Sequence, residues 1–367
     1  MIQSDWEGPW VIADHAFEVT KRGIPNGGKL FSIISEYDDY LAYVKKKVGY
    51  EPGDTLALIA PFLIAHDLNS NFLIKVAKDN ANFIDGALKA ISIITEMGYP
   101  LRIISTSYCQ YVYETASIAG ISNVHVKCTY FDIDKYINKV NKNDKKFLRK
   151  KAQEIAKYPP LGISATVTEK ELSETALEAI HALDNLFWEE LPKTSFREVL
   201  DTVKPLGGFR KYQALLDFLK EEKKELQECE AIGDSITDWV MLMKTKEAGG
   251  LAISFNGNEY AIRNSNIAVI SETCLITPIV IDVFRKKGLS AVEELARNWT
   301  YKRLKKAAME NWLDPLLFET LMHSISQKSK KTFPLAVWIT DENLGEIIRR
   351  SMQMRKTVRG ATVGSLG

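Results

Sequence analysis

Hydrophobic and polar positions alternate along this chain with two different periods, and the two together predict a parallel α/β fold. Segments such as 30–44, 111–119 and 210–221 carry apolar residues at steps of three and four, as amphipathic helices do. Short runs that favour β-strands lie at 1–4, 101–104, 124–126, 229–232, 251–254 and 267–270. Alternating strands and helices are typical of a Rossmann-like sheet covered by helices.

Two long helical stretches interrupt this alternation and predict inserted units. We expect a helical cap at about 21–95, just after the first strand, and a second helical insert at about 133–205. Residues 1–20 and 96–275 then form the α/β core, and 276–367 a mainly helical C-terminal extension.

Composition excludes several classes of function. The chain has 48 basic and 47 acidic residues, a net charge of +1, so no overall field attracts nucleic acid. Its longest apolar stretch, 56–65, contains Pro61 and is too short to span a bilayer. We find no signal peptide pattern, and we therefore expect a cytoplasmic protein that does not span a membrane.

The cysteines and histidines show no metal-ligand spacing. This predicts no zinc site, no disulfide framework and a reducing interior. Near the acidic motifs described next, Cys109 is expected to be a packing residue and His15 a polar loop residue. The four cysteines are Cys109, Cys128, Cys229 and Cys274.

Acidic residues stand beside turn-forming residues where two predicted strands end. The letters D-W-E-G occupy 5–8, and G-D-S-I-T-D occupy 233–238. A third strand ends at Ser105, and Lys211 opens a helix just after two glycines. Because parallel sheets bind ligands at the carboxyl ends of their strands, we expect these groups at one edge. Clustered carboxylates there favour a divalent cation beside a carboxylate nucleophile.

The order of these four motifs resembles the haloacid dehalogenase (HAD) superfamily, and most closely its phosphoserine-phosphatase-like branch. The resemblance covers about residues 1–270. It implies a Rossmann-like core whose cap closes over the site and selects the substrate. It also implies Mg²⁺-dependent hydrolysis of a small phosphorylated metabolite through an aspartyl-phosphate. The D-x-E-G-P start is further similar to an archaeal subgroup named after a subunit (A subunit R) of an energy-converting hydrogenase.

The resemblance implies a role for each motif residue. Asp5 corresponds to the nucleophile, and Glu7 to the acid/base that protonates the leaving oxygen and then activates water. Asp5 and Asp234 would hold Mg²⁺ together with the Glu7 backbone carbonyl. Ser105 would donate a hydrogen bond to the phosphoryl group, and Lys211 would place positive charge beside it.

Neighbouring residues leave alternatives open. Thr106 and Ser107 directly follow Ser105, and Arg210 could replace Lys211 as the cation. Asp238 would orient Lys211 or a metal-bound water, and it completes an acidic set for the metal; alone, its spacing from Ser235 also fits a helix-capping box. Residues that could contact the substrate are Asp14 and Glu18, where the chain enters the cap, and Thr237.

Two departures from the family pattern support a second hypothesis. HAD phosphatases usually carry Asp where Glu7 stands, so acid/base chemistry needs a pocket that accommodates one more methylene. Gln3 and Ser4 replace apolar residues, which predicts a first strand that is short or exposed on one face. The chain could therefore be an accessory HAD-fold subunit of an energy-converting hydrogenase complex. Formation of a homo-oligomer is also left open.

Overall fold

A seven-stranded sheet organises the protein, with the strand order β3-β2-β1-β4-β5-β6-β7. The computed structural model describes residues 1–163, 167–327 and 333–365. Neighbouring strands are parallel except β6 and β7, which are antiparallel. This arrangement confirms the predicted Rossmann-like α/β fold. The strands are Ile2–Ser4 (β1), Leu101–Tyr108 (β2), Val126–Thr129 (β3), Glu230–Gly233 (β4), Leu251–Phe255 (β5), Ile267–Ile270 (β6) and Leu335–Trp338 (β7).

The polar first strand lies at the centre of the sheet, between β2 and β4. It is short, which was one of the two predicted alternatives; Gln3 and Ser4 are fully buried, so the other alternative, a strand exposed on one face, does not apply. Ser4 Oγ donates to the Asp5 carbonyl and accepts from Trp10 Nε1, both at 2.7 Å. Because these hydrogen bonds satisfy the hydroxyl, a polar residue is tolerated there. Asp5 follows directly after this strand and therefore lies at the carboxyl edge of the sheet.

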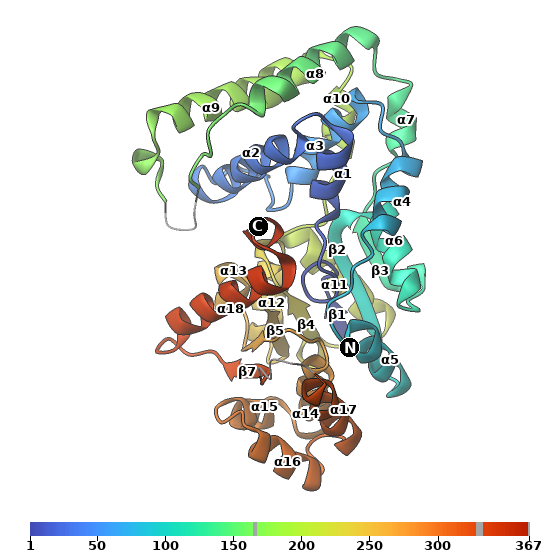
Figure 1. The fold of residues 1–367 in the computed structure, drawn as a ribbon, viewed down its shortest axis with the longest axis vertical. Coiled ribbons are helices and arrows are strands. Elements are labelled where there is room, and N and C mark those ends of the chain that lie inside the picture. The colour runs from blue at the N-terminus through green and yellow to red at the C-terminus, as the bar shows by residue number, and fades with distance from the viewer. Residues whose placement is uncertain (164–166, 328–332, 366–367) are drawn as a thin grey trace.

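Two separate insertions build a single helical cap above that edge (Figure 1). Apolar side chains of both insertions share one core, in which the rings of Tyr37 and Phe62 pack against Phe187. The segment predicted as an extra helical insert at about 133–205 is therefore the second half of the cap. The cap helices are His15–Gly23 (α1), Gly27–Asp39 (α2), Thr55–Ala65 (α3), Ser70–Asp79 (α4), Ile133–Ile137 (α7), Lys142–Ile155 (α8), Glu174–Asn185 (α9) and Arg197–Thr202 (α10).

The expected limits of the cap shift at both ends. Ala16 and Phe17 of α1 pack in the core of the cap, although residues 1–20 were assigned to the sheet domain. Ala90 and Ile94 of α5 (Ala87–Glu96) pack instead in the hydrophobic core of the sheet domain. Helical periodicity marks which residues are buried but not the element that buries them, so it could not place these helices. The remaining helices around the sheet are Cys109–Ile118 (α6), Phe209–Glu221 (α11), Trp239–Glu247 (α12) and Glu259–Arg263 (α13).

The C-terminal extension packs on the sheet domain and also adds to the sheet. Its helices α14 to α17 lie at the end opposite the cap, and α18 returns to the middle of the molecule (Figure 1). We had expected mainly helices here, but residues 335–338 form β7 against β6. The helices are Ile276–Lys287 (α14), Leu289–Ala296 (α15), Tyr301–Met309 (α16), Pro315–Ser326 (α17) and Leu344–Arg359 (α18). Residues 164–166 of the predicted insert and 328–332 and 366–367 of the extension lie outside the described residues.

Cys109 and Cys128 form a disulfide, with their Cα atoms 5.2 Å apart. The expectation of no disulfide framework was therefore wrong for this pair, and Cys109, expected to be a packing residue, is buried and also cross-linked. The pairing of β2 with β3 brings the two residues together, and cysteine spacing alone does not reveal such pairing. Cys229 and Cys274 are free and buried.

Within the described ranges no single helix has the length and apolar character to cross a membrane, and α3 and α4 pass only as a pair that meets at a bend of 116°.

Candidate active site

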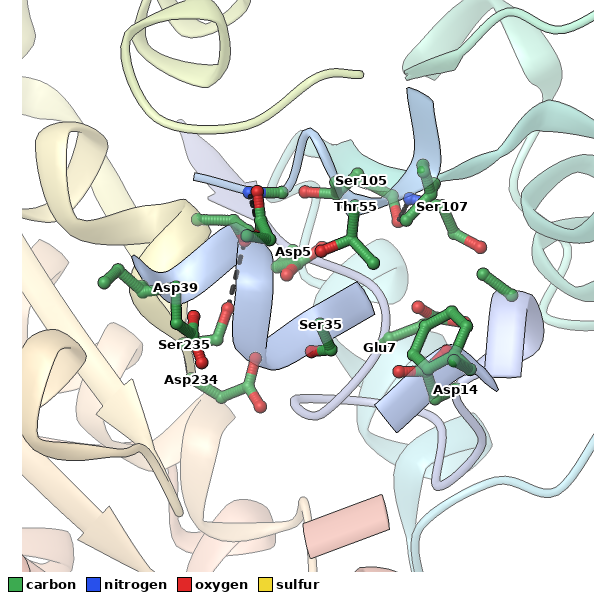
Figure 2. A pocket seen from close by; sticks show the side chains of 18 of the residues that line it. Asp5, Glu7, Asp14, Ser35, Asp39, Thr55, Ser105, Ser107, Asp234 and Ser235 are labelled. Carbon is green, nitrogen blue, oxygen red and sulfur yellow. Dashed lines mark hydrogen bonds between the residues drawn. The ribbon is translucent and has the colours of Figure 1, made fainter. Parts of the chain in front are cut away.

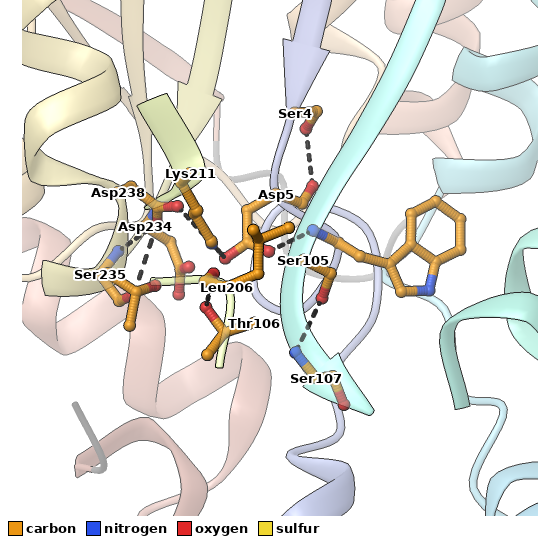
Figure 3. A network of polar contacts seen from close by, with 12 residues as sticks. Ser4, Asp5, Ser105, Thr106, Ser107, Leu206, Lys211, Asp234, Ser235 and Asp238 are labelled. Carbon is orange, nitrogen blue, oxygen red and sulfur yellow. Dashed lines mark hydrogen bonds and ion pairs between the residues drawn. The ribbon is translucent and has the colours of Figure 1, made fainter. Parts of the chain in front are cut away.

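A buried lysine joins two carboxylates at the carboxyl edge of the sheet (Figure 3). Lys211 Nζ lies 2.7 Å from Asp5 Oδ2 and 2.6 Å from Asp238 Oδ1. Lys211 and Asp238 are fully buried, and Asp5 is only 4 % exposed. Asp5 follows β1, Lys211 lies in the first turn of α11, and Asp238 follows β4. Because buried charges are costly unless they are paired, these three residues form one electrostatic unit.

Burial and ion pairing act in opposite directions on this unit. Burial raises the pKa of Asp5, as do Asp238 and Asp234, while the Lys211 ammonium lowers it. Burial lowers the pKa of Lys211, but Asp238 and Asp5 outweigh it, so that pKa is raised and Lys211 keeps its charge. An additional cation beside Asp5 would favour its ionised, nucleophilic form.

Asp238 serves the structure of the loop as well as the lysine. Its Oδ2 accepts hydrogen bonds from the backbone amides of Asp234 and Ser235, at 3.0 and 3.1 Å. With Ser235 it forms a capping box, which confirms that interpretation of the spacing. Its Oδ1 accepts a hydrogen bond from Lys211. Of the two functional roles considered, orienting Lys211 is the one that the contacts support.

Three carboxylates are placed so that they could share a metal ion. One oxygen each of Asp5, Asp234 and Asp238 lies within 4.8 Å of the others. Oxygen donors of this kind suit a hard divalent cation. Since both oxygens of Asp238 already accept hydrogen bonds, Asp5 and Asp234 fit best as direct ligands. The Glu7 side chain does not belong to this group within the described part of the chain.

Two arginines of the C-terminal helix α18 reach the same carboxylates, and the sequence analysis missed them. Arg355 Nη1 and Arg359 Nη1 both contact Asp234 Oδ2, the latter at 3.0 Å. Their side chains are only 2 % and 7 % exposed. The spacing of four residues places both on one helical face, which is a signal visible in the sequence. Nothing in the sequence indicates that this helix returns to the sheet edge.

A cavity of about 110 Å³ lies between the sheet edge and the cap (Figure 2). From the core it is lined by Asp5, Glu7, Ser105, Thr106, Ser107, Asp234, Ser235, Thr237, Arg355 and Arg359. From the cap it is lined by Asp14, Ser35, Asp38, Asp39 and Thr55, among others. Asp14 and Thr237 thus lie where a substrate contact was predicted.

Two predicted candidates lie elsewhere. Glu18 does not line this cavity; it pairs with Lys21 and Arg22 on another face of α1, because the helical twist carries it away from the site. Arg210 binds Asp54 of the cap rather than the phosphate site. Lys211, and not Arg210, is therefore the cation beside Asp5.

The three hydroxyl residues of β2 have different surroundings. Ser105 Oγ accepts a hydrogen bond from the Ser107 amide at 3.3 Å, so its hydroxyl proton can be donated to a ligand. Thr106 Oγ1 donates to the Leu206 carbonyl at 2.9 Å and holds that loop in place. Ser107 Oγ is buried and has no hydrogen-bond partner among the described residues, although it lines the cavity. Buried hydroxyls are rarely left unpaired, so Ser107 joins Ser105 as a candidate donor to a ligand.

Glu7 lines the cavity near Asp14 (Figure 2). Its Oε1 accepts a hydrogen bond of 2.8 Å from the His15 backbone amide. Burial raises the pKa of Glu7 well above its usual value, and Asp14 adds to this. A carboxyl that keeps its proton can serve as a general acid.

We had expected His15 to lie in a loop, but it lies in a helix. It is fully buried in the first turn of α1 and stacks on Tyr111, with ring centroids 4.6 Å apart. Burial lowers the pKa of His15 to about 3, so the imidazole is neutral. Its ring therefore supports the segment that carries Glu7 and adds no charge.

Gly8 allows the turn after β1 to approach Asp234. Its φ is +98°, and a Cβ there would lie 2.1 Å from Asp234 Oδ2. We expect Gly8→Ala to displace this carboxylate and to lower kcat/KM for any reaction catalysed at this site by about 100-fold, since small misplacements in an active site have effects of this size. Steady-state kinetics measures the loss. Gly249→Ala is the matched control, because Gly249 has a φ of +85° but no atom near its Cβ position. If both variants lose activity equally, backbone strain and not the close approach explains the effect.

Comparison with known proteins identifies a similar structure but no named family. No family model matches the chain, and no curated protein matches it. The solved structure of gene product AF1437 from Archaeoglobus fulgidus is similar, with 29% sequence identity and a TM-score of 0.77. The match covers 100% of this chain and 98% of that chain, so the similarity includes the cap and the C-terminal extension. The chain is thus similar over its whole length to an archaeal α/β protein whose description states no activity.

Proposed function

We propose that this protein is a Mg²⁺-dependent phosphomonoester hydrolase of the HAD type that acts through an aspartyl-phosphate on Asp5. The observation that carries the proposal is the Asp5 carboxylate at the end of the central strand, 2.7 Å from a buried ammonium and grouped with Asp234. Phosphoryl transfer requires a positioned nucleophile and positive charge around the transferred group, and this arrangement offers both.

Each neighbouring residue then has a defined task. Asp5 attacks phosphorus, and Lys211 stabilises the negative charge of the phosphoryl oxygens beside it. Ser105 and Ser107 donate hydrogen bonds from the β2 side of the cavity. Mg²⁺ held by Asp5 and Asp234 would neutralise further phosphoryl charge.

Glu7 completes the reaction as general acid and then as general base. It protonates the leaving oxygen of the substrate, and after the alcohol departs it removes a proton from the water that attacks the aspartyl-phosphate. The cap covers the site and excludes bulk water during the first step.

The size of the cavity limits the substrate. A volume of about 110 Å³ is below the range of roughly 300–1,000 Å³ typical of pockets for drug-sized ligands, which favours a small substrate. We therefore propose a small phosphorylated metabolite. We place the enzyme in the cytoplasm. The disulfide does not oppose this, because disulfides persist inside some hyperthermophilic cells as well as outside cells.

Turnover of an aryl phosphate by the purified protein tests the proposal. We expect hydrolysis with Mg²⁺, loss of hydrolysis when EDTA removes the ion, and recovery when Mg²⁺ is restored. A wild-type protein that stays inert over a broad panel of phosphomonoesters with Mg²⁺ refutes the proposal. Stable co-purification of such an inert protein with a partner would instead support the accessory-subunit hypothesis.

The general-acid role of Glu7 predicts a dependence on the leaving group. We expect Glu7→Gln to reduce kcat by about 100-fold or more for an alkyl phosphate, whose leaving oxygen needs a proton. The loss should be much smaller for formation of the phosphoenzyme from an aryl phosphate, because a phenolate can leave unprotonated. Burst kinetics separates this step from hydrolysis of the phosphoenzyme. Glu7→Asp keeps the acid but shortens it by one methylene, and it is the control: its loss should be similar for both substrates, unlike that of Glu7→Gln.

A further inference from the structure

We infer that the α18 arginines make cation binding depend on the phosphoryl group, so that the divalent ion binds weakly alone and tightly together with phosphate. This inference rests on the cation site of the proposed function but concerns residues outside the HAD motifs. Arg355 and Arg359 would set the metal affinity as positioning residues, through their contacts to Asp234.

The charges around the predicted cation site already balance. Three carboxylates and three cations lie there in two sets of ion pairs, one around Lys211 and one around Asp234, and their charges sum to zero. Guanidinium groups keep their positive charge in proteins, so the two arginines supply the same charge as one divalent ion. The carboxylates are Asp5, Asp234 and Asp238, and the cations are Lys211, Arg355 and Arg359.

Other acidic side chains interact with these cations only at longer range, as the pKa values of Glu7 and Asp14 show: burial raises both, and Arg359 opposes part of that rise. Four further carboxylates line the cavity toward the cap. Among the described residues, none of them forms an ion pair with Lys211 or with the two arginines. These carboxylates are Glu7, Asp14, Asp38 and Asp39.

The contacts of Asp234 show where the arginines and a divalent cation compete for its negative charge. Both guanidinium groups bind the same oxygen of Asp234, Oδ2, and Arg355 also donates to the Asp234 backbone carbonyl at 3.1 Å. The second carboxylate oxygen, Oδ1, is therefore left for a cation. An ion bound there would lie close to two fixed positive charges in a site where Asp234 is 1 % exposed. Repulsion between charges is strong at such a depth, because little water screens it.

A phosphoryl group reverses this penalty. A phosphate dianion brings two negative charges, which match the two positive charges of the cation. The ion and the phosphate together therefore keep the site neutral, whereas either of them alone does not. Coupling between two ligands is reciprocal, so the ion should strengthen phosphate binding by the same factor.

Arg359 is the better residue for a test. Arg355 is the more deeply buried of the two, whereas Arg359 lies at the end of α18. Arg359 Nε also donates to the Ile12 carbonyl at 3.1 Å, on the segment that leads to the cap. Replacing it removes one charge beside Asp234 and leaves Arg355 to hold the carboxylate.

Titration calorimetry with Mg²⁺, with and without inorganic phosphate, tests the inference without any turnover. We expect phosphate to tighten Mg²⁺ binding to the wild type by at least about tenfold, because opposite charges attract strongly in a buried site with little water. Arg359→Gln should bind Mg²⁺ alone about tenfold more tightly, with a correspondingly smaller effect of phosphate. Arg359→Lys keeps the charge and should behave like the wild type. Arg350→Gln is the control on the same helix, because Arg350 is 40 % exposed and pairs only with Glu346 among the described residues.

Each outcome is decisive for this inference. Tighter Mg²⁺ binding by Arg359→Gln alone, with thermal unfolding like that of the wild type, supports it. Unchanged or weaker binding by this variant overturns it, as does a failure of Mg²⁺ to bind to any of the proteins. A protein that binds ion and phosphate as expected but hydrolyses no ester refutes the proposed function and leaves this inference intact.

Discussion

Asp5→Asn is expected to lower phosphatase kcat by at least about 1,000-fold, because an amide cannot replace the carboxylate nucleophile. The substitution keeps the shape of the side chain. Lys211 keeps its contact with Asp238 at 2.6 Å, so the protein should remain folded. The measurement is kcat for an aryl phosphate with saturating Mg²⁺.

Chemical trapping distinguishes a nucleophile from a residue that only binds the metal. Acid quenching of the wild type during turnover of a phosphorus-labelled substrate should leave label on the protein, and Asp5→Asn should retain none. Asp39→Asn is the matched control, since Asp39 lines the same cavity from the cap. It should form the phosphoenzyme normally. A labelled Asp5→Asn protein would show that another residue carries the phosphoryl group.

Lys211→Met is expected to destabilise the fold by about 3 kcal/mol or more, because it leaves two buried carboxylates without their cation. The ammonium lies within 2.7 Å of both Asp5 and Asp238, and the lysine is fully buried. Urea unfolding measures the loss. Activity should fall with it, since the positive charge beside the phosphoryl group is lost.

Two further variants show whether the buried charges cause this loss. Arg210→Met removes the adjacent cation, whose ion pair with Asp54 is partly exposed, and should cost no more than about 1 kcal/mol. Asp5→Asn combined with Lys211→Met should recover part of the stability lost by the single lysine variant, because one uncompensated charge is removed. If Arg210→Met costs as much as Lys211→Met, charge burial does not explain the effect.

Local patterns in the sequence were sufficient for the sheet domain and its motif residues. Short apolar runs placed six of the seven strands, with β3 only two residues from its predicted start. The rule that parallel sheets bind ligands at the carboxyl ends of their strands predicted that Asp5 and Asp234 share one edge, and the structure shows that their strands are neighbours. The geometry of Glu7 and Ser105 at the cavity also agrees with their predicted positions.

The missed features depend on contacts between segments far apart in the chain. β7 belongs to the sheet because it pairs with β6, and a short apolar run by itself does not show its partner. The Cys109–Cys128 disulfide depends in the same way on the pairing of β2 with β3. The two insertions form one cap because their apolar faces bury each other.

By itself, the sequence determined the class of fold, the edge of the sheet where chemistry is expected and the carboxylates and lysine found there. Strand period, turn residues and the order of motifs can be recognised in the sequence without knowledge of the packing. Only the tertiary structure decided that Arg355 and Arg359 neutralise Asp234. Their helix is positioned by burial against the sheet, which involves residues distant in the chain, and no local pattern encodes the element on which a helix packs.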